Sequence, residues 1–113
     1  MLVAFSVAPS GSSELTRENP EGSVHDAVAA AVAVVRESGL PNSTDSMFTT
    51  IEGEWDEVMA VVKNATDAVA RYGSRVSLVL KADIRPGRTG ELTGKVERLE
   101  AAILEQEQFE GHS

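Results

Sequence analysis

The stretch EWDEVMAVVKNATDAVARYGSRVSLVLKAD, residues 54–83, decides the fold, because it places a helix directly before a strand. In its first part apolar residues recur in steps of three and four, which predicts an amphipathic helix over residues 54–72. After Gly73, apolar and polar residues alternate, which predicts a strand over residues 75–84. The helical stripe consists of Trp55, Val58, Val62, Ala65, Val69 and Tyr72. We expect this stripe, Trp55 included, to lie in the core.

Toward the N-terminus, the apolar segment Leu2–Ala8 predicts a first strand that ends at Pro9. A polar loop follows over residues 10–22, and a helix then begins at Ser23. Gly39 is expected to end this helix, since glycine is common just past a helix C-terminus.

The segment 42–53 alternates small polar and apolar residues, and predicts either one bent strand or a tight pair of strands. Beyond the strand over residues 75–84, a loop rich in Gly and Pro leads to a third helix over residues 91–106. One face of that helix carries Leu92, Val96, Leu99 and Ile103. The last residues, 107–113, are polar, and we expect a flexible C-terminal tail there.

The expected order is strand, helix, one or two strands, helix, strand, helix. Two right-handed β-α-β units in tandem give an antiparallel sheet with two helices on one face. The sequence therefore predicts an α+β fold, a ferredoxin-like βαββαβ sandwich with an extra C-terminal helix. A chain of 113 residues fits one such domain, which we place at residues 1–106.

Two helices leave the other face of the sheet bare. The bare face would carry Ser77, Val79 and Lys81, together with one of the two alternating sets of the first strand. Both sets are too apolar to form a large patch in water. We expect this face to pack against another subunit.

The composition narrows the possible partners. A formal net charge of −8 repels phosphate backbones and anionic lipid, so neither nucleic acid nor a membrane is an expected partner. The chain has no cysteine, which excludes disulfides and thiolate metal sites and fits a cytoplasmic location. His25 and His112 offer no set of metal ligands. No metal is expected.

Three segments in order resemble the thiamine-binding protein family: VAFSVAP at 3–9, DSMFTTIEGEWDEVM at 45–59 and RVSLVLKADIR at 75–85. The resemblance covers about residues 2–100. It implies a ferredoxin-like fold, a homodimer or homotetramer formed through the sheets, and binding of thiamine or its hydroxymethylpyrimidine moiety. It implies no catalysis and no cofactor. The chain differs from many relatives at Phe48, where they carry Gly, and in a longer loop over residues 10–22.

The candidate ligand-binding residues are Ser6, Asp45, Met47, Phe48, Thr49, Glu52, Ser77 and Lys81. A pyrimidine needs hydrogen-bond partners at its edge, which Asp45 or Thr49 could supply, and apolar walls on its faces, which Met47 or Phe48 could supply. Each position also has a structural interpretation. The cluster could be a polar hairpin with two core residues, and Glu52 could cap the helix that follows it.

The remaining three candidates have simpler alternatives as well. Ser6 could be a strand residue that faces a small neighbour, and Ser77 and Lys81 could lie at a subunit contact or form a surface ion pair.

Two other functions stay open beside non-catalytic binding as a carrier, buffer or sensor. One is a small dimeric oxygenase-type enzyme, which needs a polar cavity with a basic or aromatic constellation. One Tyr, one Trp and two His provide little of that. The other is a metabolite-sensing regulatory module, whose binding chemistry would be the same.

Overall fold

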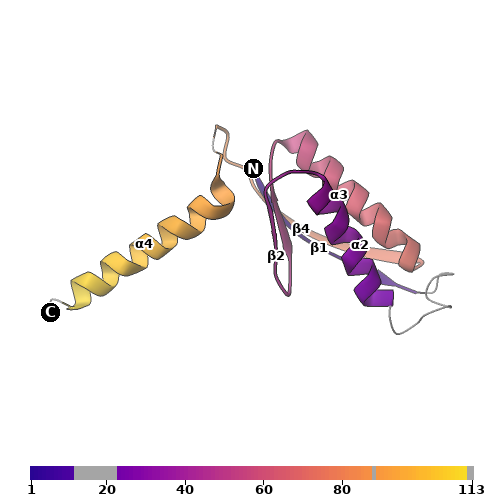
Figure 1. Ribbon diagram of the computed structural model, residues 1–113, viewed down its shortest axis with the longest axis horizontal. Helices are drawn as coiled ribbons and strands as arrows, with labels where there is room; N and C mark the ends of the chain where they lie inside the picture. Colours follow the sequence, from indigo (N-terminus) through magenta and orange to yellow (C-terminus); the bar gives the residue numbers. More distant parts are fainter. Residues whose placement is uncertain (12–22, 88, 112–113) are drawn as a thin grey trace.

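The structure is a computed structural model that describes residues 1–11, 23–87 and 89–111 (Figure 1). Most of the predicted loop over residues 10–22, and His112, lie outside these ranges. The elements in chain order are β1 (Leu2–Ser10), α2 (Ser23–Glu37), β2 (Asn42–Thr44), β3 (Thr49–Glu52), α3 (Trp55–Val69), the short 3-10 helix η1 (Ala70–Tyr72), β4 (Arg75–Asp83) and α4 (Glu91–Gly111).

The four strands form one antiparallel sheet in the order β2-β3-β1-β4. Helices α2 and α3 lie side by side on one face of it (Figure 1). This arrangement confirms the predicted ferredoxin-like sandwich, and it shows that residues 42–53 form a tight pair of strands. The prediction that Pro9 ends the first strand is wrong by a residue, because β1 continues to Ser10 and pairs with β4 along its whole length.

The register decides which set of β1 residues faces the helices. Val3, Phe5 and Val7 are buried, and they pair with Ala82, Leu80 and Leu78 of β4. The open face therefore carries the other set of each strand, because successive side chains alternate. That set comprises Leu2, Ala4, Ser6 and Ala8 of β1, Thr50 and Glu52 of β3, and Arg75, Ser77, Val79, Lys81 and Asp83 of β4.

The core between the sheet and the two helices is mostly aliphatic, as the low aromatic content of 4% requires. Its members are Val3, Phe5, Val7, Ala27, Ala31, Val35, Ile51, Val58, Val61, Val62, Ala65 and Val69. The prediction that Trp55 belongs to this core is wrong, since 53% of its surface is exposed. Trp55 is the first residue of α3, and the buried residues of this helix begin only at Val58.

Glu54 is the N-cap of α3. Its side chain accepts from the backbone of the third helical residue, Glu57, and the Glu57 carboxylate accepts from the Glu54 N–H. Such a capping box satisfies two of the backbone donors that every helix start leaves unpaired. Capping of this helix, which was one of two alternatives for Glu52, belongs to Glu54.

Helix α4 extends away from the rest of the molecule (Figure 1). It continues to Gly111, beyond the end that the sequence predicts near Gln106. The radius of gyration is 17.9 Å, whereas a compact domain of this length is expected at about 13 Å. Most of α4 therefore packs against nothing within the part of the chain that the structure describes.

Candidate functional site

A recess lies where the β2–β3 hairpin stops following β1. β3 pairs with β1 only from Leu2 to Phe5, and β1 then continues to Ser10 without a partner on that side among the described residues. The turn of the hairpin stands over this unpaired edge, and α2 closes the inner side. The result is a cavity of about 210 Å³ with a mostly apolar lining.

Five of the eight predicted site residues line this cavity, namely Ser6, Asp45, Met47, Phe48 and Thr49. The other lining residues are Phe5, Val7 and Ala8 of β1, Val28, Ala31 and Val32 of α2, and Thr44 and Ser46 of the hairpin. The hairpin and β1 thus contribute predicted residues to the same cavity. The sequence analysis did not include the wall from α2, because Val28 and Ala31 follow the ordinary helical stripe and carry no signal beyond core packing.

The hairpin turn is held by Asp45. Its Oδ1 accepts from the backbone N–H groups of Met47 at 2.7 Å and Phe48 at 2.9 Å, and its own N–H donates to the Phe48 carbonyl at 3.0 Å. These bonds from Phe48 and Met47 lower the pKa of the Asp45 carboxyl. Asp45 is thus an ionised turn residue that places a negative charge at the rim of the cavity.

Two hydroxyl groups supply polar atoms at the hairpin side of the cavity. The Oγ1 atoms of Thr44 and Thr49 lie 3.1 Å apart, and Thr49 is buried. A hydroxyl can both donate and accept, so this pair can match either kind of group at the edge of a heteroaromatic ring. Phe48 and Met47 are partly exposed, at 36% and 71%. Their apolar surface remains available for contact with a ligand.

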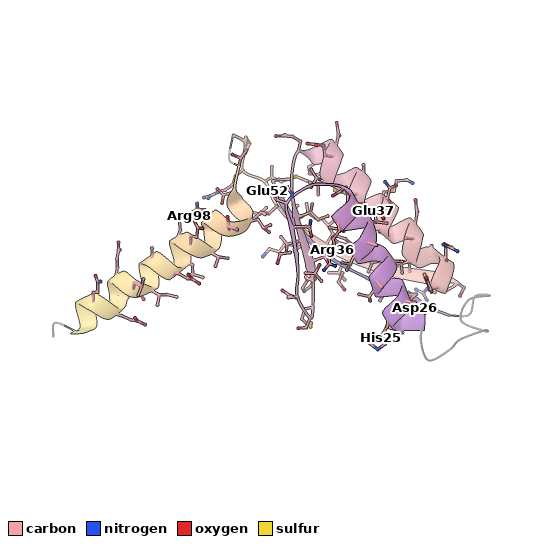
Figure 2. All side chains as sticks on the ribbon, viewed as in Figure 1. His25, Asp26, Arg36, Glu37, Glu52 and Arg98 are labelled. Atoms are coloured by element: carbon pink, nitrogen blue, oxygen red, sulfur yellow. The ribbon has the colours of Figure 1, made fainter. Side chains whose placement is uncertain are left out.

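The structure places the remaining three candidates elsewhere. Ser77 and Lys81 lie on the open face of β4 and do not line the cavity. Glu52 is buried at the end of β3, where its Oε2 accepts from the backbone N–H of Glu91 at 2.6 Å. Figure 2 shows Glu52 beside the first turn of α4. Glu52 therefore caps α4, a helix that begins 39 residues later in the chain.

Two further hollows contain none of the predicted residues. One of about 360 Å³ lies between α2 and α3 and is lined in part by Glu37, Glu57 and Asn64. Another of about 190 Å³ lies beside Trp55 and Arg85. The first is larger than the hairpin cavity but more open to solvent. His25 is exposed in the first turn of α2 (Figure 2), as expected of a solvated residue.

Fold and recess together define a ferredoxin-like domain with a ring-sized, mostly apolar cavity at the edge of its sheet. The chain belongs to the thiamine-binding protein family, whose model matches residues 3–100. This confirms the resemblance seen in the sequence. The UPF0045 proteins of Mycobacterium bovis and Mycobacterium tuberculosis are each 51% identical over 108 residues, which cover 95% of this chain and 98% of theirs.

Solved structures agree in fold. A domain of unknown function, DUF77, from Bacillus cereus is 31% identical with a TM-score of 0.66, and the match covers 80% of this chain and 82% of that one. A candidate thiamine biosynthesis or salvage protein from Thermotoga maritima is 25% identical with a TM-score of 0.68, covering 87% and 96%. Separately, none of the helices in the described ranges is long and apolar enough to cross a membrane.

Proposed function

We propose that the protein binds thiamine, or its hydroxymethylpyrimidine moiety, in the cavity beneath the β2–β3 hairpin. The observation that carries the proposal is the convergence of five predicted ligand residues on this one cavity. Membership of the thiamine-binding family supports the choice of ligand. The proposal is specific about position, because the hollow between α2 and α3 and the hollow beside Trp55 contain none of the predicted ligand residues and no paired hydroxyls among their described lining residues.

The size of the cavity favours the pyrimidine end of the ligand. Pockets for drug-sized molecules span roughly 300–1,000 Å³, and this cavity has about 210 Å³. It therefore suits a single substituted ring. The hydroxyls of Thr44 and Thr49 meet the ring edge, Phe48 and Val28 meet its faces, and the rest of thiamine extends outward. The Asp45 charge at the rim favours a cationic thiazolium over an anionic group.

We propose binding without catalysis. Among the described lining residues, Asp45 is the one ionisable side chain, and two backbone groups already occupy its Oδ1. General acid–base chemistry needs a group whose pKa lies near the working pH, whereas the Asp45 pKa is lowered. This supports a carrier, buffer or sensor over the oxygenase-type alternative.

We also propose a homodimer or homotetramer formed through the open sheet face, in the cytoplasm and without nucleic acid or membrane partners. The exposed Val79 among the small residues of that face supports the assembly. The charge of −8 argues against phosphate-rich partners, and the absence of cysteine fits a reducing compartment.

A pair of variants tests which cavity binds the ligand. Thr49→Val keeps the shape of the side chain and removes a buried hydroxyl from the hairpin cavity, so thiamine affinity in calorimetry should fall roughly tenfold. Asn64→Ala removes a polar group from the larger hollow between α2 and α3 and should leave the affinity unchanged. The reverse pattern would place the ligand between the helices and overturn the assignment.

A further inference from the structure

Helix α4 presents an apolar face that no other described part of the chain covers. The side chains of Val96, Leu99, Ile103 and Leu104 are 44–61% exposed. In proteins, most of the stability of a helix comes from the packing of its apolar face against another surface. The apolar face of α4 is therefore available to a surface other than those of the described residues of its own chain.

The first turns of α4 are bonded to the end of the sheet. Glu91 N–H donates to Glu52, and Lys95 Nζ pairs with Asp83 Oδ2 at 2.6 Å. Glu52 and Asp83 both belong to the open face. They lie at the same end of it, since each pairs with Leu2 of β1 in the register of the sheet. Helix α4 thus begins at one end of its own open face and then leaves it, so the rest of that face stays bare (Figure 1).

The bare part of the sheet and the projecting part of the helix have similar lengths. Residues 75–81 of β4 extend about 23 Å at the usual rise of a strand. Residues 96–111 of α4 extend about 24 Å at the rise of a helix. On β1 the bare face carries three small residues, Ala4, Ser6 and Ala8, which allow the close approach of a helix.

The charges of the two surfaces are opposite. After Arg98 the described part of α4 carries only acidic charges, and Glu100 and Glu107 border one shallow groove with Ile103 and Leu104. On the open face, Arg75 and Lys81 lie on either side of the exposed Val79, whereas the acidic Glu52 and Asp83 lie at the end where α4 begins and are bonded to its first turns. Neither cation forms an ion pair with a described residue. If instead the α4 helices of two copies packed against each other in parallel, their acidic halves would lie together and repel.

We propose that α4 of one copy lies across the open sheet face of a second copy, and that the second copy's α4 lies across the first. Each copy supplies one uncovered helix and one uncovered sheet, so a two-fold axis closes the assembly. The acidic residues of the helix then face Arg75 and Lys81, and Val79 meets the apolar stripe. The inference rests on the proposed assembly through the open face, and it names what covers that face.

Cross-linking tests this directly, because the chain has no cysteine of its own. Full-length Ile103→Cys and Val79→Cys are mixed, equilibrated and oxidised. The expected product is a disulfide between the two different variants. The control Asp67→Cys, on the exposed side of α3, should form no disulfide with either variant.

Other products would overturn the inference in distinguishable ways. If disulfides form only between two Val79→Cys chains, the sheet of one copy packs against the sheet of the other. If they form only between two Ile103→Cys chains, helix α4 of one copy packs against helix α4 of the other. Light scattering of the unmodified chain gives the mass independently. A mass of 12.0 kDa at micromolar concentration would refute the assembly as a whole. The thiamine proposal would be untouched by any of these results, since calorimetry measures it.

Discussion

The ring of Phe48 lines the cavity and leaves about a third of its surface in solvent. Stacking of an aromatic side chain on a ligand ring is worth roughly 0.5–1.5 kcal/mol beyond the buried area. We therefore expect Phe48→Ala to weaken thiamine binding about two- to tenfold in calorimetry without changing the circular dichroism spectrum. Tighter binding would instead mean that the ring fills space that the ligand needs.

Asp45 gives a pH dependence of definite sign. Its pKa in the folded protein is lowered by the bonds from Phe48 and Met47. The stabilisation is therefore present above the unfolded value of about 3.9 and is lost as the pH falls through the lower folded value. Urea midpoints should drop below about pH 4, and the drop should be smaller in Asp45→Asn. An equal drop in both would show that the turn does not depend on the charge.

Glu52 separates a structural role from a ligand role. Because its carboxylate accepts the Glu91 N–H from a buried position, Glu52→Ala should cost roughly 1–3 kcal/mol of stability. Glu52→Gln, which keeps an acceptor, should cost less. Neither variant should change thiamine affinity, since Glu52 does not line the cavity. Urea unfolding and calorimetry measure the two effects, and a loss of affinity in a folded Glu52→Gln would return the residue to the site.

At the scale of elements, Gly94 weakens α4 in its second turn. A methyl group there would approach only the flexible Arg98 guanidinium, at 3.4 Å. Alanine is favoured over glycine inside a helix by about 1 kcal/mol, so Gly94→Ala should raise the urea midpoint. A lower midpoint would indicate that another surface approaches the helix closely at this position.

The elements also show what the sequence could predict. Residues 54–83 were readable because a helical stripe and a strand alternation depend on neighbours in the chain. Trp55 was misplaced because periodicity does not tell where along a helix the buried residues begin. The role of Glu52 could not be read at all, since its partner Glu91 is brought to it by the turn after β4. The stripe of α4 was visible, but a stripe does not say which surface covers it.

At the scale of the whole molecule, the chain consists of a two-layer body and a projecting helix α4. Its dimensions are 63 Å by 32 Å by 19 Å. If α4 packs on a second copy, as inferred above, the assembly should be more compact per chain. Small-angle scattering should then give a curve that the extended single chain does not fit. A curve that fits the extended monomer would contradict the assembly.

The central claim is that the cavity beneath the β2–β3 hairpin binds thiamine through its pyrimidine end. Calorimetric titration of the full chain with thiamine, and separately with hydroxymethylpyrimidine, tests it most directly. We expect saturable binding of both ligands with dissociation constants below about 1 mM, which corresponds to roughly −4 kcal/mol or better. Titrations that show no heat with either ligand at millimolar concentration would contradict the claim.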